Sequence, residues 1–452
     1  MQVRKSAAWA LAIFVCGALL LAPAIWNGFP LLQYDTGGYL ARPFEGYLVP
    51  SRPAPYGLVL AAAASLDFWP ALILQIGATI WILSLTLRAL GYRNRLQALA
   101  ALIAILSLLT SLPFLTAILL TDIFAGLGVL GLHLLLFQSA DLSRRERLAL
   151  MAFVAFCGST HSATLFLLIG IVVAFGILSL LRVVVAHGLR QASLAALLAF
   201  AVMFAANFAV SRRDIWPPGG YGIVFGRMLQ DGIVARYLNE HCPDPALRLC
   251  PYRNDLPDNA DDFLWSDGVF NRLGRFTGLN EEMRSIVLGS LREYPFLQMK
   301  LAALAAAKQF VFVGSGEGVL DSVSHTYGIM EHYTPSVVPA MRQARQQHGA
   351  LDFTAINKVH IPVALLSLAI LLALAARALW RGKFDPVERL TLTVTLAFFC
   401  NAAICGVFAN PHDRYGARLA WIGTLVVALW IARSMTRPDS SREAASAKEP
   451  PH

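Results

Sequence analysis

The sequence has little charge for its length. Only 14% of its 452 residues are Asp, Glu, Lys or Arg, whereas soluble domains carry about 25%. Together with 57% hydrophobic residues and a mean hydropathy of +0.57, this excludes a disordered protein and an ordinary cytosolic enzyme. Six cysteines in a chain of 452 residues are too sparse for a small secreted disulfide scaffold. The composition therefore predicts a polytopic membrane protein.

The sequence also lacks familiar catalytic motifs. It contains no HExxH, no GxSxG, no Walker A motif and no GxGxxG after a strand, and each of these would have pointed to one enzyme class. The acidic run between Asp255 and Asp267 lacks the spacing of an EF-hand, and we interpret it as a solvated loop. No internal repeat is visible.

Long apolar runs dominate what is present. They fall at about 7–26, 68–87, 96–112, 118–137, 148–163, 164–181, 193–210, 358–380, 388–408 and 417–434. A spanning helix takes about 20 residues. The sequence therefore predicts an all-α fold, a transmembrane bundle of about ten spans with one large extracytoplasmic loop region.

Basic residues are unevenly distributed between the predicted loops. With the N-terminus in the cytoplasm, the short outer loops hold only Arg42, Arg52, Arg414 and Arg418. The 18 basic residues inside are Arg4, Lys5, Arg88, Arg93, Arg95, Arg144, Arg145, Arg147, Arg182, Arg190, Arg377, Arg381, Lys383, Arg389, Arg433, Arg437, Arg442 and Lys448. The positive-inside rule then predicts an inner (cytoplasmic) membrane protein with both termini cytoplasmic. The net charge of +9 reflects topology, so nucleic acid is not an expected partner.

This topology divides the chain into four parts. Residues 1–210 form a membrane bundle with a first outer loop at 27–57, and 211–357 form the extracytoplasmic region. Spans follow at 358–434, and 435–452 is predicted to be a disordered cytoplasmic tail. The apolar stretch at about 296–313 contains two lysines, so we expect an interfacial or loop-packed helix. An alternative for the start is a signal peptide cleaved near Ala22-Pro23-Ala24.

Two cysteines stand apart from the apolar runs. Cys242 and Cys250 lie in the outer region, bounded by prolines, and this favours a disulfide that closes a short loop in an oxidising compartment. A metal held by both thiolates and His241 is the alternative.

Three polar segments map to the outer face. The first contains Asp35, between Tyr34 and Thr36-Gly-Gly-Tyr39, and continues to Arg52-Pro-Ala-Pro-Tyr56. Gly37-Gly38 indicate a tight turn close to a ligand. The alternative is a glycine-rich turn with a solvated Asp.

The second and third segments open predicted spans. Asp122 begins the fourth span, either as a functional carboxylate or as a helix cap. Arg414, Tyr415 and Arg418 precede the last span, and the two arginines could hold an anion. The alternative is an Arg–Asp pair that anchors the helix end. His161, at an outer turn, is a weaker candidate.

Together these segments resemble the GT-C superfamily of polytopic glycosyltransferases, which use polyprenyl-phosphate sugar donors. The matching residues are Tyr34-Asp35-Thr-Gly-Gly-Tyr39 with Arg52-Pro-Ala-Pro-Tyr56, then Thr121-Asp122, then Asp413-Arg414-Tyr415. The likeness covers residues 1–140 and about 405–434. Family members often have paired acidic residues in the first loop, whereas Thr36 follows Asp35 here.

The resemblance implies an inverting single displacement on an envelope acceptor. Asp35 would be the general base, and Asp122 would orient the acceptor or a divalent cation, the one cofactor left open. Arg414 or Arg418 would bind the donor phosphate, with Arg52 and His161 as alternates. Tyr56 and Tyr415 complete the implied substrate site, and a groove between spans would hold the prenyl chain.

Two other classes of function stay open from the residues alone. A lipid or polysaccharide transporter also needs polar groups in an apolar bundle, although its polar sites usually lie at the midplane of repeated halves. A non-catalytic assembly partner of an envelope-polysaccharide system is the other alternative. The sequence does not identify the sugar, the acceptor or the oligomeric state.

Overall fold

The chain is all-helical wherever the structure describes it. The computed structural model describes residues 2–92 and 94–436, and within them every regular element is a helix. Strand-like pairing within the described residues is limited to isolated bridges, one of which pairs Leu31 with Ile118. Residues 437–452 of the predicted tail lie outside the described residues.

All ten predicted apolar runs are helical. They form α1 (Gln2–Asn27), α5 (Trp69–Ala89), α6 (Arg95–Leu109), α8 (Asp122–Gln138), α9 (Arg144–Ser159), α10 (Ser162–Leu180), α11 (Leu189–Ser211), α20 (Phe353–Arg381), α21 (Pro386–Phe408) and α22 (Asp413–Thr436). Among the described residues, seven helices are long and apolar enough to cross a membrane, which indicates a multi-pass membrane protein. Helices α6, α8 and α9 have 15, 17 and 16 residues, or about 25 Å at most. The count of ten spans therefore stays a prediction.

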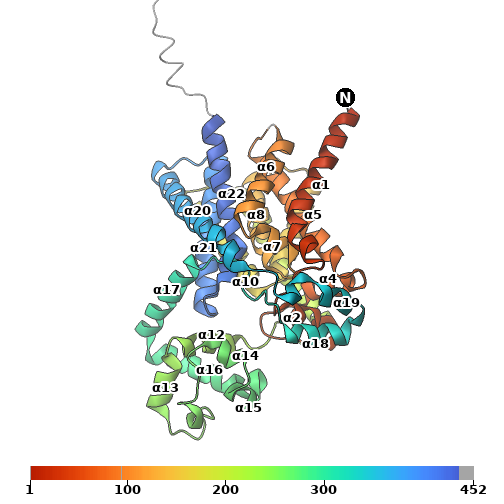
Figure 1. The fold of residues 1–452 in the computed structure, drawn as a ribbon. Coiled ribbons are helices and arrows are strands. Elements are labelled where there is room, and N and C mark those ends of the chain that lie inside the picture. The colour runs from red at the N-terminus through yellow and green to blue at the C-terminus, as the bar shows by residue number, and fades with distance from the viewer. Residues whose placement is uncertain (1, 93, 437–452) are drawn as a thin grey trace, which may run out of the picture.

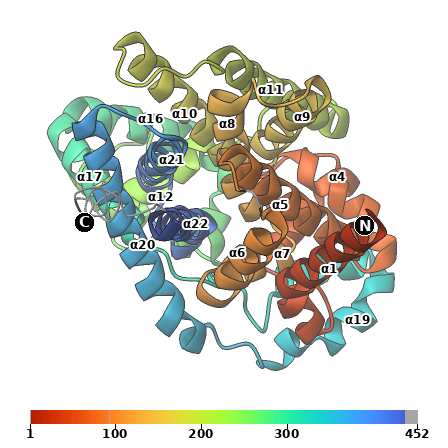
Figure 2. The same ribbon diagram turned by 90° about the horizontal axis from the view of Figure 1, so that it is seen from above.

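Helix α8 is the centre of the bundle. All 17 of its residues are buried, because α5, α9, α10, α11, α21 and α22 surround it. Seen from above, these neighbouring helices lie around α8 (Figure 2). Helix α1 begins and α22 ends on the same side of the bundle (Figure 1).

A helical subdomain covers the other end of the bundle, and we call it the cap. It comprises α12 (Gly220–Gln230), α13 (Ile233–His241), η2 (Cys250–Tyr252), α14 (Ala260–Trp265), α15 (Val269–Arg272) and α16 (Arg275–Glu293). The cap has its own apolar core, separate from that of the bundle, with Phe225, Phe270 and Met283 at its centre. Helix α17 (Pro295–Val311) leads from the cap back to the bundle (Figure 1).

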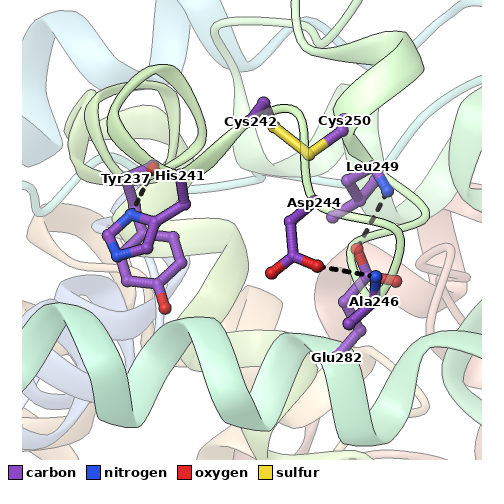
Figure 3. The surroundings of a disulfide bond; sticks show 8 residues. All are labelled: Tyr237, His241, Cys242, Asp244, Ala246, Leu249, Cys250 and Glu282. Carbon is purple, nitrogen blue, oxygen red and sulfur yellow. Dashed lines mark hydrogen bonds between the residues drawn. A yellow bond between two sulfur atoms is a disulfide. The ribbon is translucent and has the colours of Figure 1, made fainter.

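The predicted disulfide is present in the cap. The Cys242 and Cys250 sulfurs are bonded to each other, so they are not metal ligands. The loop that they close is also held by two hydrogen bonds, from the Ala246 amide to Asp244 at 2.8 Å and from the Leu249 amide to Glu282 at 2.9 Å. His241 stacks on the Tyr237 ring and points away from the sulfurs (Figure 3).

Short helices line the cap end of the bundle. They are α2 (Thr36–Leu40), α3 (Arg42–Glu45), α4 (Ala54–Ala63), η1 (Ala64–Leu66), α7 (Leu112–Ala117), α18 (Ser324–Tyr333), η3 (Pro335–Val337), α19 (Val338–Gln343) and η4 (Arg345–His348). The interpretation of Gly37-Gly38 as a turn was wrong, since both lie inside α2. They allow close packing instead: a Cβ on Gly37 would lie 2.8 Å from the Thr326 Cα, and one on Gly38 would lie 2.7 Å from the Arg52 Cδ.

Candidate functional site

Arg414 joins two predicted carboxylates at the cap end of the bundle. Its side chain, in the first turn of α22, is only 7% exposed. The Nε atom donates to Asp122 Oδ2 at 2.7 Å, and Nη1 donates to Asp35 Oδ2 at 2.6 Å. The structure thus brings together the three residues on which the sequence interpretation mainly depended. It also shows that the Asp122 carboxylate does not cap α8, because no side chain caps this helix.

Arg52 extends the cluster on the side of the first loop. Its guanidinium is paired with Asp35 Oδ1, so Asp35 is held between two arginines. Burial, followed by the nearby charge of Arg414, lowers the pKa of Arg52 to about 10. Arg52 therefore keeps its positive charge at neutral pH.

A close helix contact places Asp122 beside the first turns of α22. Gly126 lies one turn after Asp122, and the Trp421 ring packs directly on it: a Cβ at Gly126 would lie 2.7 Å from that ring. The Trp421 indole N–H also donates to the Arg418 carbonyl at 3.2 Å. Because α8 and α22 pack so closely here, a residue larger than glycine at 126 would push the two charged helix ends apart.

A pocket lies beside Asp122 and Arg414, and both polar and apolar side chains line it. Asp122 Oδ1 and Arg414 Nη2 are buried and have no hydrogen-bond partner among the described residues. The pocket is lined by Leu31, Ser111, Phe114, Leu115, Ile118, Leu120, Asp122, Ser315, Gly316, Glu317, Val319, Phe353, Arg414 and Ala417. The lining therefore offers charged and apolar contacts close together.

Arg418 is buried deeper along α22. It is 1% exposed, and its guanidinium donates to Asn401 Oδ1 at 2.6 and 3.1 Å and contacts Cys405 Sγ at 3.2 Å. No carboxylate among the described residues pairs with it. The Tyr415 ring lies beside both arginines, 5.8 Å from the Arg414 guanidinium carbon and 5.5 Å from that of Arg418.

Besides Arg418 and Tyr415, two more predicted site residues do not join the ion-pair cluster. The Tyr56 hydroxyl donates to Gln75 Oε1 at 2.7 Å inside the bundle, and its ring packs edge-on against Tyr39 and Phe124. His161 is the N-cap of α10, where its Nδ1 accepts from the Ala163 amide at 3.0 Å. These contacts give both side chains a structural role. Burial and the charges of Arg418, Arg414 and Arg52 lower the pKa of His161.

The sequence interpretation missed a second network at the rim of the site. His412 bonds Glu317 at 2.6 Å through Nδ1 and lies 3.3 Å from Asp261 of the cap through Nε2. Glu317 also accepts from the Arg414 amide at 2.7 Å. Burial favours neutral His412, but Asp261 and Glu317 outweigh it and raise its pKa to about 9. Burial likewise opposes charge on Glu317, yet His412 and Arg414 lower its pKa overall.

The cap reaches the site through one short helix. Asp261 and Trp265 lie four residues apart on α14, so they share a face. Trp265 lies 5.6 Å from the Arg52 guanidinium and is 46% exposed, while Asp261 reaches His412. The acidic run is therefore not only a solvated loop. Two sequence signals for this network were available. Glu317 lies between two glycines, and His412 lies directly before Asp413-Arg414.

Comparisons with known proteins add no relative. No protein-family model, curated protein or solved structure matches the chain. Within the described residues, no group of three His, Cys, Asp or Glu side chains is arranged to hold a metal ion. The groups available for chemistry at the site are its carboxylates, its buried arginines and the pocket that Asp122, Glu317 and Arg414 help to line.

Proposed function

We propose that the chain is a membrane glycosyltransferase of the GT-C type. It would move a sugar from a polyprenyl-phosphate donor to an envelope acceptor by an inverting single displacement. The observation that carries this proposal is the convergence of Asp35, Asp122 and Arg414 beside a pocket that both charged and apolar side chains line. A polyprenyl-phosphate donor likewise combines a charged phosphate with an apolar chain.

The buried arginines support the phosphate half of the proposal. Among the described residues, Arg418 hydrogen-bonds to a neutral amide and a thiol and pairs with no carboxylate, and a buried charge without an opposite charge is costly. Arg414 has one buried Nη2 group without a partner. An anionic ligand would compensate both groups, and arginine matches phosphate oxygens with a pair of parallel hydrogen bonds.

The ion pairs also suggest how the base becomes free. Arg52 and Arg414 both bind Asp35, and a carboxylate held in this way is a poor proton acceptor. A donor phosphate would compete for Arg414 and release one oxygen of Asp35. Donor binding would thus prepare the base, so that the acceptor is deprotonated only when the donor is present.

The transfer step then balances simply. The acceptor hydroxyl gives its proton to Asp35, and its oxygen forms a bond to the anomeric carbon. The bond from that carbon to the phosphate oxygen breaks, and the electron pair leaves with the polyprenyl phosphate, which the arginines stabilise. Attack opposite the leaving group inverts the anomeric centre.

We place the cap and the site on the extracytoplasmic face of an inner membrane. The loop charges predict cytoplasmic termini, and the structure has α1 beginning and α22 ending on the side opposite the cap (Figure 1). An oxidising compartment would also suit the Cys242–Cys250 disulfide. Reporter fusions after Arg145 and near Asp255 test this orientation.

The decisive test replaces Asp35 by Asn. This change keeps the size of the side chain and removes the proton acceptor, so transfer should fall by about 10²–10⁴-fold, the usual contribution of a general base. Sugar transfer from polyprenyl-phosphate donors would be measured in membranes, and donor binding would be measured on purified protein. Binding should persist, because the arginines remain.

Asp255→Asn is the matched control, since Asp255 is an exposed carboxylate in the cap; it should leave transfer unchanged. Full activity of Asp35→Asn would reduce Asp35 to a structural residue and move the role of base to Asp122. A wild-type protein that transfers no sugar from any such donor would contradict the glycosyltransferase proposal and favour a transporter or an assembly partner.

A further inference from the structure

Helix α17 presents an exposed apolar face that the proposed reaction does not use. Two adjacent columns of side chains form this face. One consists of Phe296, Lys300, Leu304 and Lys308, and the other of Met299, Ala303, Ala307 and Val311; all eight residues are exposed. Phe296 is 83% exposed and Met299 is 68% exposed, which is unusual for apolar side chains in contact with water.

The opposite face of α17 is fully engaged. Near the start of the helix, Leu297 and Leu301 pack against the core of the cap. Farther along, the Ala305 backbone lies so close to α21 that a Cβ on Gly406 would be 2.7 Å from the Ala305 carbonyl oxygen. Phe310 packs on Phe399 of α21 with a ring separation of 5.0 Å. The orientation of α17 is therefore set by both the cap and the bundle.

The exposed face of α17 lies next to a helix that is long and apolar enough to cross a membrane. Phe399 and Phe408 of α21 are 54% and 61% exposed, and α21 is one of the helices that can cross a membrane. Helix α17 packs along α21 and lies obliquely at the periphery in both views (Figures 1 and 2). With 17 residues, or about 25 Å, it is shorter than the bilayer core of about 30 Å, and its exposed face carries Lys300 and Lys308.

We propose that the exposed face of α17 lies in the lipid–water interface, and that Lys300 and Lys308 bind the head groups of anionic phospholipids. The apolar residues would enter the outer part of the acyl region, and the lysines would extend toward the phosphates. Two cations on an otherwise apolar face match anionic lipid and do not suit an apolar protein partner. This proposal does not depend on the chemistry proposed above.

Hydrogen bonds connect α17 to the residues just before Arg414. Gln309 of α17 exchanges two hydrogen bonds with the His412 backbone, both at 2.9 Å. Just past the helix, the Gly314 amide donates to Asp413 Oδ1 at 2.7 Å. His412 and Asp413 immediately precede Arg414. A lipid-anchored α17 would therefore hold the start of α22 in place.

The test measures whether residue 299 touches lipid. Met299→Cys, made in a Cys400→Ser background, would carry an environment-sensitive fluorophore, and the full chain would be reconstituted in vesicles of phosphatidylcholine and phosphatidylglycerol. Spin-labelled lipids should quench this fluorophore. Glu281→Cys, at a cap residue whose side chain is 78% exposed, is the control and should be quenched several-fold less. Equal quenching at the two positions would overturn the proposal.

A second measurement tests the lysines. Each lysine near a membrane surface is worth about 1 kcal/mol of attraction to anionic lipid, or about fivefold in binding. Quenching at residue 299 by spin-labelled phosphatidylglycerol should therefore exceed that by phosphatidylcholine, and Lys300→Gln with Lys308→Gln should remove the preference. A preference that survives both changes would overturn the assignment of the lysines. Shielding of residue 299 that disappears on protein dilution would indicate a second copy instead of lipid.

Discussion

The two ends of the bundle hold arginine–carboxylate pairs of different kinds: Arg414 of α22 pairs at the cap end, and Arg381 of α20 pairs with Glu388 of α21 at the opposite end. At the cap end, the side chains of Arg414, Asp122 and Asp35 are 7%, 3% and 13% exposed. At the opposite end, Arg381 and Glu388 are 42% and 19% exposed and lie 3.2 Å apart. Glu388 also completes the capping box that starts α21. The Arg381–Glu388 pair thus has a structural role, whereas burial of the cap-end pairs has no such explanation.

This difference separates a candidate site from ordinary helix anchoring. Buried ion pairs are often no better for stability than apolar residues of the same size, because desolvation offsets their attraction. A fold that keeps three buried charges and leaves Asp122 Oδ1 and Arg414 Nη2 without partners is therefore not optimised for stability at this point. Unpaired polar atoms of this kind are typical of places that bind a ligand.

The largest effect on stability is expected for Arg414→Ala. Removing the guanidinium leaves Asp122 buried without its cation, which should cost about 3–5 kcal/mol of unfolding free energy and abolish donor binding. Arg414→Lys should restore part of the stability but little binding, because the planar geometry is lost. Chemical unfolding of the purified protein and donor titration would measure both. Wild-type stability in Arg414→Ala would place Arg414 in the same class as the surface arginines.

A smaller effect is expected at the rim when the pH rises. The pKa of His412 is raised to about 9, above its ordinary value of about 6.5, so its stabilising charge is present below pH 6.5 and is lost through pH 9. The loss should be on the order of 2 kcal/mol and should loosen the cap, where Asp261 is its partner. Unfolding midpoints at pH 6.5 and 10 would show this difference.

His412→Gln supplies the control for the pH effect. Glutamine can keep a hydrogen bond to Glu317 or Asp261 but carries no charge in this range, so its unfolding midpoint should not show the same decline. A variant that declines as steeply as the wild type would assign the pH dependence to another group.

The smallest effect is expected for Arg381→Ala at the opposite end. An exposed ion pair contributes about 0–1 kcal/mol, so unfolding and donor binding should both stay near wild type. The comparison between the two ends would fail if Arg381→Ala and Arg414→Ala destabilised the protein equally.

Much of the bundle could be predicted because hydropathy is a local property. Each of the ten apolar runs is a helix, and the disulfide followed from two cysteines outside those runs. The sequence assigned Asp35, Asp122 and Arg414 to one face but did not predict their ion pairs. Their direct contacts depend on how distant helices pack, and no local pattern encodes that packing.

The features that the sequence did not predict lie in short helices and connections. A hydrophobic pattern repeats too few times there to be recognised. The cap folds from short helices with a separate core, and the sequence pattern indicated only a loop region. Glu317 lies in a glycine-rich connection, and Asp261 lies on a six-residue helix. Their partner His412 belongs to another segment, so only the folded structure shows that these three residues form one network.

The distance along the chain between Asp122 and Arg414 affects how the protein is made. The two residues are 292 positions apart, so at about 5–20 residues per second the carboxylate is synthesised roughly 15–60 s before its cation. During this time Asp122 sits at the start of an apolar helix with no Arg414 to pair with. A nascent chain interrupted before the last helix would keep that unpaired acid, which cellular quality control could recognise as a sign of incomplete synthesis.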